Sequence, residues 1–358
     1  MTLKQDISNF IDDIRKRNKV PKFISNDFSN FNEQKSRIFY SGPYWDDNEI
    51  KNALISFLTG KWLPSGEYVH KFEIAFSKKI RASNSVMVNS GSSANLLMLT
   101  SLKKIFNWRD GDEIIVSPVG FPTTIATIIQ ANLCPVFIDV ELISLNFDLK
   151  LIKDKISNKT KGIFLSPVLG NPPDLDYLID ICQNNNLKLI LDGCDSLGTT
   201  WDNKPIQVFS DVSSCSFYPA HHITTGEGGM VVTNNKDLEE YGRKYRNYGK
   251  FDYNVEGLNF RMNEFTAAIG VVQVDRLKEI VTFKNEYAEK LNLKFGDRVK
   301  LPDGMTSGYY KYIVFEPIEK STGKVYDEQC HNILNHNVVL PNSEWVPDNH
   351  WCVPIYYS

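Results

Sequence analysis

The chain has 358 residues and a net charge of −3, so its charge gives no sign of a polyanionic partner such as nucleic acid. No apolar stretch approaches the roughly 18 residues of a transmembrane helix, and the polar N-terminus lacks the apolar segment of a signal peptide. The six cysteines are scattered without a CxxC pair, which is unlike a zinc site or a disulfide framework. We therefore expect a soluble, reduced, cytoplasmic protein.

Short apolar runs alternate with segments of helical periodicity through the first half of the chain. The predicted elements are helix 92–105, strand 112–117, helix 123–132, strand 135–140, helix 149–156, strand 161–168, helix 174–186 and strand 187–192. Wholly apolar strands in such an alternation are typical of a mostly parallel sheet with helices on both faces. The predicted fold class is therefore α/β with three layers.

The second half of the chain continues with strand 229–234, helix 236–248 and two further helices at 263–277 and 279–293. After about Asp297 the sequence changes to short strands and turns rich in proline, glycine and asparagine. These changes predict an N-terminal helical extension over residues 1–40, a large domain over 41–296 and a small C-terminal α+β domain over 297–358.

A run of small residues, VNSGSSANLL (88–97), stands at the start of the first of these helices. Backbone N–H groups and hydroxyls from Ser90, Gly91, Ser92 and Ser93 at the positive end of a helix form an anion cradle suited to phosphate. Taken alone, such a run is more often a serine-rich helix cap without a ligand.

Two other positions follow predicted strands. Phe121, in SPVGFP (117–122), can stack on a planar ring, although a core or rim phenylalanine is at least as frequent there. Asp192 ends the strand 187–192, and ligands of open α/β sheets bind at the carboxyl ends of strands. Its carboxylate can pair with a protonated ring nitrogen, or it can simply cap a turn.

The order of these features is more specific than any one of them. Phosphate cradle, aromatic residue and strand-terminal aspartate are followed by SFYPAHHITTGEGG at 216–229. This order resembles the DegT/DnrJ/EryC1/StrS family of sugar-nucleotide aminotransferases, as do the blocks GKWLPSGEYVHKFE (60–73) and GLNFRMNEFTAAIG (257–270). The resemblance covers about residues 40 to 277, and it implies the fold type I architecture of pyridoxal-phosphate enzymes and a homodimer with shared sites.

One position departs from the family pattern. The family's lysine, which holds pyridoxal phosphate (PLP) as a Schiff base, is replaced by His221, and no lysine occurs between Lys204 and Lys236. Because imidazole forms no stable Schiff base, the cofactor must be held without a covalent bond, with pyridoxamine 5'-phosphate (PMP) as its natural resting form. The resemblance therefore narrows to the NDP-4-keto-6-deoxysugar 3-dehydratases, which remove the C3 hydroxyl of a nucleotide-linked 4-keto-6-deoxysugar.

The segments LGNPPD (169–174) and DGCDSLG (192–198) also resemble those dehydratases. One of their branches holds a [2Fe-2S] cluster, and Cys194 stands where its first cysteine ligand falls. The insert that carries the other cysteine ligands is absent from residues 244–260. We therefore expect no metal site, and a resemblance to the cluster-free branch that acts on GDP-4-keto-6-deoxymannose in colitose synthesis.

The resemblance implies a role for each candidate residue. His221 is expected to be the general base, since histidine titrates at about pH 6.5, and His222 to orient it, to be structural, or to be a solvent-facing turn residue. Asp192 is expected to keep the ring nitrogen protonated, and Asp195 to lie near the ring's 3′ oxygen. The other expected cofactor contacts come from Gly91, Ser92, Ser93, Phe121 and Ser216, and from Asn259, which would reach the phosphate in the neighbouring subunit.

Two other functions stay open at this point. A sugar aminotransferase working without the Schiff-base lysine would convert the ketosugar into an aminosugar with glutamate as donor. Glutamate is also the expected amino donor that regenerates PMP for the dehydratase. A non-catalytic protein would keep the fold for binding alone, but the intact cradle, Asp192 and glycine-rich turn argue against a decayed site.

Overall fold

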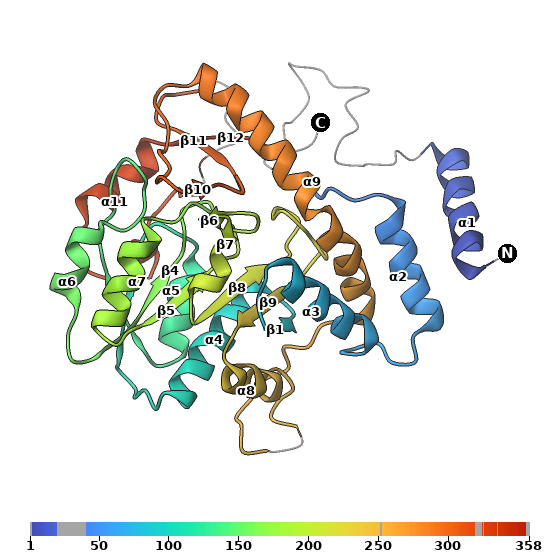
Figure 1. Cartoon of the computed structure of the whole chain (residues 1–358), viewed down its shortest axis with the longest axis horizontal. Helices are drawn as coiled ribbons and strands as arrows, with labels where there is room; N and C mark the ends of the chain where they lie inside the picture. Colours follow the sequence, from blue (N-terminus) through green and yellow to red (C-terminus); the bar gives the residue numbers. More distant parts are fainter. Residues whose placement is uncertain are drawn as a thin grey trace.

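The computed structural model describes residues 2–19, 41–250, 253–318, 324, 326–334 and 336–355. At its centre lies a seven-stranded sheet of order β1-β9-β8-β5-β4-β2-β3, with helices on both faces (Figure 1). Its strands are β1 Asn84–Val88, β2 Glu113–Val116, β3 Cys134–Phe137, β4 Thr160–Leu165, β5 Lys188–Asp192, β8 Val212–Ser216 and β9 Gly229–Thr233. The predicted three-layer α/β fold is thus confirmed.

The strand directions gather several strand ends at one edge of this sheet. Strand β9 is antiparallel to both of its neighbours, β1 and β8. The strands β8, β5, β4, β2 and β3 are parallel to one another, so β1 runs in the same direction as they do. The carboxyl ends of β1, β2, β5 and β8 therefore meet where β9 begins, which is the edge at which α/β sheets bind ligands.

The two faces of the sheet are covered by different helices. Because side chains alternate along a strand, Val86 and Val88 pack in one core cluster and Met87 in another. The first cluster lies with α4 Gly91–Ile105, α5 Pro122–Gln130 and α8 Lys236–Arg246. The opposite face is covered by α3 Glu67–Lys79, α7 Leu175–Asn184 and α9 Glu264–Lys294.

Helix α9 runs unbroken over residues that we predicted to form two helices, at 263–277 and 279–293. Lys278, between the two predicted helices, is a good helix former, and no glycine or proline stands there to end a helix. Leu277 and Ile280, on either side, both bury in the same core cluster. The prediction of a break was therefore wrong.

Two shorter elements also differ from the prediction. Strand β3 ends at Phe137 rather than at residue 140, and Val140 instead forms an isolated bridge with Phe147. The helix predicted over 149–156 is a 3-10 turn, Leu149–Leu151, followed by the single-turn α6, Ile152–Lys155. Ile156 then adopts an extended conformation, which ends the helix early.

The N-terminal helix α1, Leu3–Asn18, packs on α2, Asp47–Thr59, where Arg15 Nε lies 2.6 Å from Asp47 Oδ1. The rest of the predicted extension, residues 20–40, lies outside the described residues. None of the helices in the described ranges combines the length and the apolar character needed to cross a membrane.

The C-terminal part consists of short elements. Its strands and helices are β10 Met305–Thr306, β11 Tyr312–Val314, α10 Cys330–Ile333, α11 Pro341–Trp345, the 3-10 turn Val346–Asp348 and β12 Trp351–Val353. Strands β11 and β12 pair with each other, whereas β10 pairs with β6 Thr200–Trp201, which also pairs with β7 Lys204–Pro205, followed by a 3-10 turn at Ile206–Phe209. The segment that follows β10 is therefore tied to the region just after β5.

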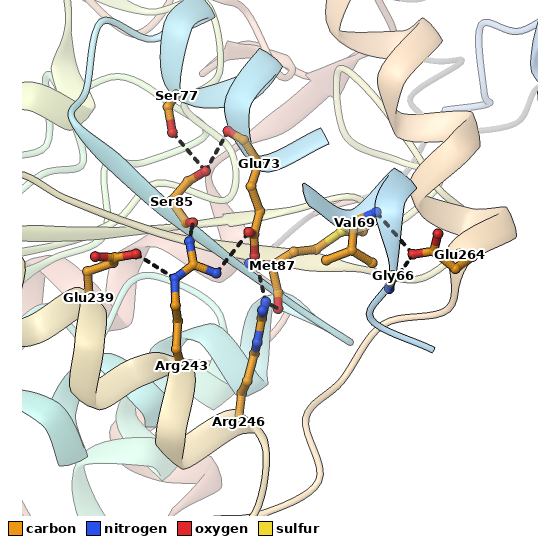
Figure 2. A network of polar contacts seen from close by, with 10 residues as sticks. All are labelled: Gly66, Val69, Glu73, Ser77, Ser85, Met87, Glu239, Arg243, Arg246 and Glu264. Atoms are coloured by element: carbon orange, nitrogen blue, oxygen red, sulfur yellow. Dashed lines mark hydrogen bonds and ion pairs between the residues drawn. The ribbon is translucent and has the colours of Figure 1, made fainter. Parts of the chain in front are cut away.

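The edge strand β1 is held by charged side chains from two helices (Figure 2). Glu73 of α3, only 3% exposed, accepts a hydrogen bond from the Met87 amide at 2.8 Å. It also accepts from Arg243 and Arg246 of α8, at 2.9 and 2.6 Å. These arginines donate in turn to the carbonyls of Ser85 and Met87. The outer hydrogen-bonding edge of β1 is therefore satisfied within the chain, which fixes the strand that leads into α4.

The start of α3 is capped by a side chain from α9. The Glu264 carboxylate accepts hydrogen bonds from the amides of Gly66 and Val69 at 2.6 and 3.1 Å (Figure 2). It also accepts one from the Tyr68 amide at 2.8 Å. A carboxylate at the positive end of a helix is favourable. The two sequence blocks at 60–73 and 257–270 are thus in contact in the folded chain.

Candidate active site

The serine-rich run lies just beyond the carboxyl end of β1 and forms the first turn of α4. Ser90 is the N-cap, and its Oγ accepts a hydrogen bond from the Ser93 amide at 3.0 Å. The amides of Gly91 and Ser92 have no acceptor within the helix, because the first turn of a helix leaves its N–H groups unpaired. Gly91 and Ser92 therefore offer backbone donors at the positive end of α4, whereas the Ser93 amide is already bonded to Ser90 and Ser93 can contribute only its hydroxyl.

Ser216 ends β8 directly beside this turn. A side-chain carbon built on Gly91 would lie 2.8 Å from Ser216 Cβ and 2.9 Å from Cys194 Sγ, so glycine is needed there. Gly229 is constrained in the same way, because its side-chain carbon would lie 2.2 Å from the Ser90 carbonyl oxygen. The glycine-rich run at 226–229 therefore lets the start of β9 press against the cradle.

Asp192 ends β5, as predicted, and is 6% exposed. Its Oδ2 accepts hydrogen bonds from Asn95 Nδ2 at 2.8 Å and Thr124 Oγ1 at 2.6 Å. Its Oδ1 lies 3.3 Å from the Cys194 amide and 3.4 Å from Ser214 Oγ. These donors fix the orientation of the buried carboxylate. The sequence analysis missed these donors: Asn95 lies in the serine-rich run 88–97 but was not singled out there, and Thr124 and Ser214 belong to no motif of their own.

Phe121 is the N-cap residue of α5, beyond the carboxyl end of β2. Its side chain is 66% exposed, which is unusual for a phenylalanine. Thr124, one turn further along α5, is the residue that donates to Asp192. The exposed ring therefore lies on the helix turn that also contacts the strand-terminal carboxylate.

His221 lies in the turn between β8 and β9, where its amide donates to the Tyr218 carbonyl at 3.0 Å. Its side chain is largely buried, and its Nδ1 lies 3.2 Å from Asp195 Oδ1. The geometry of this contact is not that of a hydrogen bond, and the contact is an ion pair only when the imidazole is protonated. Asp195, which we expected near the cofactor's 3′ oxygen, is thus placed against the histidine that replaces the family's lysine.

The His222 side chain contacts Gly308, whereas that of His221 contacts Asp195. His222 is 3% exposed, and its Nε2 lies 2.7 Å from the Gly308 carbonyl oxygen, so Nε2 carries the proton and donates. Burial, with a contribution from the positive charge of Lys284, lowers the pKa of His222 well below its usual range. The expectation of a solvent-facing turn histidine is therefore wrong, because this imidazole is a buried donor.

A residue that the sequence analysis missed, Tyr310, covers the two histidines. The centroid of its ring lies 5.2 Å from that of His221 and 6.3 Å from that of His222. Tyr310 lies between β10 and β11, about ninety residues from the histidines along the chain, so no local motif connects them.

Asn259 lies apart from the residues above. Its backbone bridges to Asn247, and its exposed side chain accepts a hydrogen bond from Arg261 Nε at 3.0 Å. The next residue, Phe260, accepts from the Asn89 amide at 3.0 Å, so this loop runs beside the end of β1. Among the described residues of one subunit, no hydrogen bond joins the side chain of Asn259 to Asp192 or His221.

A cavity of about 370 Å³ lies beside the segment of Tyr310. Arg298, Lys300 and Lys311 are among its lining residues, together with Tyr309 and Tyr312. The lining includes no carboxylate in the described part of the chain. The positive charge of these three side chains suits the binding of an anionic group.

These residues fit a pyridoxal-type cofactor. Ser216 and Cys194 leave no room for a side chain at position 91, which is therefore glycine. No side chain of residue 91 covers the N–H groups at the start of α4, and these groups can bind a phosphate. The exposed Phe121 ring and the buried Asp192 carboxylate lie at the carboxyl ends of β2 and β5, two strands that β4 separates, at the same edge of the sheet. Strand order and donor set together define the class of the chain, a protein with the aminotransferase-like fold of PLP enzymes.

The family is equally definite. The sequence model of the DegT/DnrJ/EryC1/StrS aminotransferase family matches residues 45–319, and the chain belongs to this family. Its cofactor is therefore PLP or the amine form PMP. The predicted resemblance is confirmed, and the match extends beyond residue 277 into the C-terminal part.

Curated relatives include both dehydratases and aminosugar synthases. The chain is 35% identical to the lipopolysaccharide biosynthesis protein RfbH of Salmonella typhimurium, over 67% of this chain and 63% of that protein. It is 32% identical to a GDP-4-keto-6-deoxy-D-mannose 3-dehydratase of Escherichia coli, over 81% of each chain. It is also 32% identical to a GDP-perosamine synthase of Vibrio cholerae, over 69% of this chain and 68% of the synthase.

Solved structures support the same placement. The E. coli GDP-4-keto-6-deoxy-D-mannose-3-dehydratase with bound hydrated PLP superposes with a TM-score of 0.79 at 26% identity, covering 88% of this chain and 94% of the other. A structure of GDP-4-keto-6-deoxymannose-3-dehydratase with a trapped PLP-glutamate geminal diamine gives a TM-score of 0.78 at 26% identity, covering 89% and 95%.

Proposed function

We propose that the chain is a PMP-dependent NDP-4-keto-6-deoxyhexose 3-dehydratase without an iron–sulfur cluster. The observation that carries the proposal is His221, which stands at the position of the family's Schiff-base lysine and lies 3.2 Å from Asp195. The stretch between Lys204 and Lys236 contains no lysine that could replace it. A site of this family without that lysine leaves the cofactor amine free, and the imidazole in its place can act as a general base.

The residues divide the work as follows. When bound, PMP supplies an amine for the C4 ketone and a ring that withdraws electrons. Asp192, held by Asn95 and Thr124, keeps the proton on the ring nitrogen. His221 removes a proton from the C4′ carbon and returns a proton to the departing C3 hydroxyl. Asp195 orients His221 through Nδ1, which leaves Nε2 for the reacting atoms.

We further propose that a nucleotide-linked 4-keto-6-deoxysugar is the substrate and that glutamate regenerates PMP. The similarity to enzymes named for GDP-sugars and to a structure holding PLP-glutamate supports both parts. The product would be a 4-keto-3,6-dideoxysugar for a surface polysaccharide such as O-antigen or capsule, in line with the lipopolysaccharide relative.

The active form is proposed to be a homodimer in which Asn259 reaches the neighbouring subunit's phosphate. Apolar side chains are exposed together around the end of α2: Phe57 is 51% exposed, Leu58 66%, Trp62 67% and Leu63 52%. Phe57 stacks on Phe265 of α9 at 4.6 Å. An exposed apolar surface of this kind is typical of a subunit interface.

An aminotransferase working without the lysine is the second candidate, because a GDP-perosamine synthase is as similar in sequence as the dehydratase. The two activities differ in the product. Dehydration followed by hydrolysis removes one oxygen atom from the sugar, whereas transamination keeps the C3 hydroxyl and replaces the ketone oxygen by an amino group.

The test is to incubate the protein with PMP, glutamate and, in turn, GDP-, CDP- and dTDP-linked 4-keto-6-deoxysugars, and to weigh the products. Loss of one oxygen from one of these sugars supports the proposal. An aminosugar supports the second candidate, and failure to bind PMP at all supports a non-catalytic protein.

The absence of an iron–sulfur cluster has its own test. Purified protein is predicted to contain neither iron nor acid-labile sulfide in stoichiometric amount, because the cysteine-bearing insert is missing. Stoichiometric iron and sulfide would contradict the assignment and would require a partner reductase.

A further inference from the structure

The segment that carries Tyr310 is anchored by four consecutive carbonyl groups. The Ser307 carbonyl accepts from Asn285 Nδ2 at 2.9 Å, and the Gly308 carbonyl from His222 Nε2 at 2.7 Å. Lys284 Nζ donates to the next two carbonyls, at 3.0 Å to Tyr309 and 3.3 Å to Tyr310. The donors come from α9 and from the histidine turn, so this short segment bridges the two.

Lys284 lies on α9 and is 6% exposed. Besides the two carbonyls above, its Nζ donates to the Ile355 carbonyl at 3.0 Å. An ammonium group has three N–H donors, and three carbonyl oxygens accept from it here. A buried ammonium is tolerated only when its donors are paired in this way, so the lysine and the backbone hold each other in place.

We propose that Lys284 is a positioning residue: with His222, it fixes residues 307–310 so that the Tyr310 ring forms the wall against His221. The inference rests on the proposed function only in that His221 is the base. The ring centroid of Tyr310 lies 5.2 Å from that of the His221 imidazole, and Asp195 contacts the Nδ1 atom of the same imidazole. The carboxylate and the aromatic ring both limit the rotation of the imidazole.

A base held in this way loses efficiency when its wall moves. Misplacement by about 1 Å far from the reacting atoms can reduce a rate by about 10²-fold. Replacing Lys284 removes both donors from the carbonyls of Tyr309 and Tyr310 while leaving every group that contacts the cofactor unchanged. The expected effect is therefore on kcat, with little change in KM or in PMP affinity.

The experiment compares Lys284→Met with Lys290→Met, a matched loss of a lysine from the exposed side of the same helix. Lys284→Met is expected to lower kcat roughly 10²-fold with KM changed little. It is also expected to speed hydrogen exchange of the Gly308 and Tyr309 amides roughly 10-fold, because their hydrogen bonds to Thr199 Oγ1 and Ser307 Oγ depend on the position of this segment. Lys290→Met is expected to change neither quantity.

A second variant, Tyr310→Leu, removes the ring without touching the anchor. It is expected to lower kcat as Lys284→Met does, with the amide exchange unchanged. If Lys284→Met does not fold, Tyr310→Leu decides: wild-type kcat in that variant overturns the proposal. Faster exchange in Lys284→Met with wild-type kcat also overturns it, because the segment would then move without consequence for His221.

A readout independent of dehydration separates this inference from the proposed function. The rate at which diethyl pyrocarbonate modifies His221 is expected to rise in both Lys284→Met and Tyr310→Leu, because the covering ring has moved or gone. If the wild-type protein dehydrates no ketosugar, the proposed function fails. The rate of His221 modification still tests whether the Tyr310 ring covers His221. Equal modification rates in all variants overturn the inference.

Discussion

We propose that a single side chain, at position 221, decides between the two candidate activities of this chain. Lysine ends in a primary amine that captures PLP as a Schiff base, whereas imidazole accepts and returns protons without doing so. In this chain the imidazole of His221 faces Asp195 with one nitrogen and packs against Tyr310. The surroundings of the residue are thus those of an oriented proton carrier.

Restoring the family residue gives the most direct prediction at this scale. In His221→Lys, the longer side chain is expected to reach the cofactor aldehyde and form a Schiff base, seen as a visible absorbance band that borohydride removes. Dehydration is expected to fall roughly 10²–10⁴-fold, the usual contribution of a placed general base. Absorbance spectra with added PLP and the rate of product formation measure the two effects.

The control is His221→Asn, which removes the base without adding an amine. It is expected to lose dehydration to a similar extent and to show no Schiff-base band. If His221→Lys forms no such band and dehydrates at the wild-type rate, His221 does not face the cofactor, and the base must be another group.

At the level of the elements, the sequence predicted a strand or helix correctly where a local pattern of apolar residues indicated it. The predicted apolar runs located β2, β3, β4, β5 and β9, and Asp192 was placed because it ends one of them. Ser216, at the end of β8, was expected at the site only from the family resemblance. The contacts that complete the site were not predictable, since Tyr310 and Lys284 reach the histidine turn through tertiary packing of distant segments. The break expected in α9 was wrong because two residues of that stretch share one buried face.

The anchoring of β1 by α3 and α8 gives a prediction about stability. Glu73→Gln removes the buried charge that pairs with both Arg243 and Arg246 (Figure 2), so Arg246 loses this carboxylate partner and Arg243 keeps only Glu239. The free energy of unfolding is expected to fall by about 3 kcal/mol, as for a broken buried ion pair. Urea denaturation at a fixed protein concentration measures the change.

Glu240→Gln serves as the control for that measurement. Glu240 lies on α8, more than half exposed, and pairs with Lys236. An exposed pair of this kind contributes less than about 1 kcal/mol, so the variant should unfold almost as the wild type does. Equal stability of the two variants would show that the Glu73 network does not secure the sheet edge.

The contact between α9 and residues 309–310 gives a prediction about pH. Burial, together with the nearby charge of Lys311 and against the opposing effect of Asp195, lowers the pKa of Lys284 to about 7. In the unfolded chain a lysine titrates at about 10.4. Between these values the unfolded state binds a proton that the folded state lacks, so this group makes the free energy of unfolding rise with pH by up to about 1.4 kcal/mol per unit.

The measurement is the difference in unfolding free energy between the wild type and Lys284→Met from pH 6 to 10. The difference is expected to stay level below about pH 7, where both states hold the proton, and then to shift in favour of the wild type. A difference that does not vary with pH would mean that Lys284 keeps its ordinary pKa in the folded protein.

At the scale of the whole molecule, the proposed dimer gives each site a residue from the other subunit. The cradle, Asp192 and His221 gather at one edge of the sheet, whereas the exposed side chain of Asn259 has its contact outside them. The apolar side chains around the end of α2 provide a surface on which a second copy can pack. A two-fold dimer would place the same loop of each subunit at the other's site.

Mixing two inactive variants tests this arrangement. His221→Asn damages the site of its own subunit, whereas Asn259→Ala is expected to damage the site of its partner. In a heterodimer of the two, one site carries both defects and the other carries neither. Random exchange of subunits should therefore restore about a quarter of the wild-type dehydration rate, since half of the dimers are mixed and each has one intact site. The control is a mixture of His221→Asn with Asp192→Asn, two residues of the same site, for which every heterodimer site keeps one defect and no activity should return. If the first mixture stays as inactive as the second while subunit exchange is shown to occur, Asn259 serves its own subunit and the site is not shared.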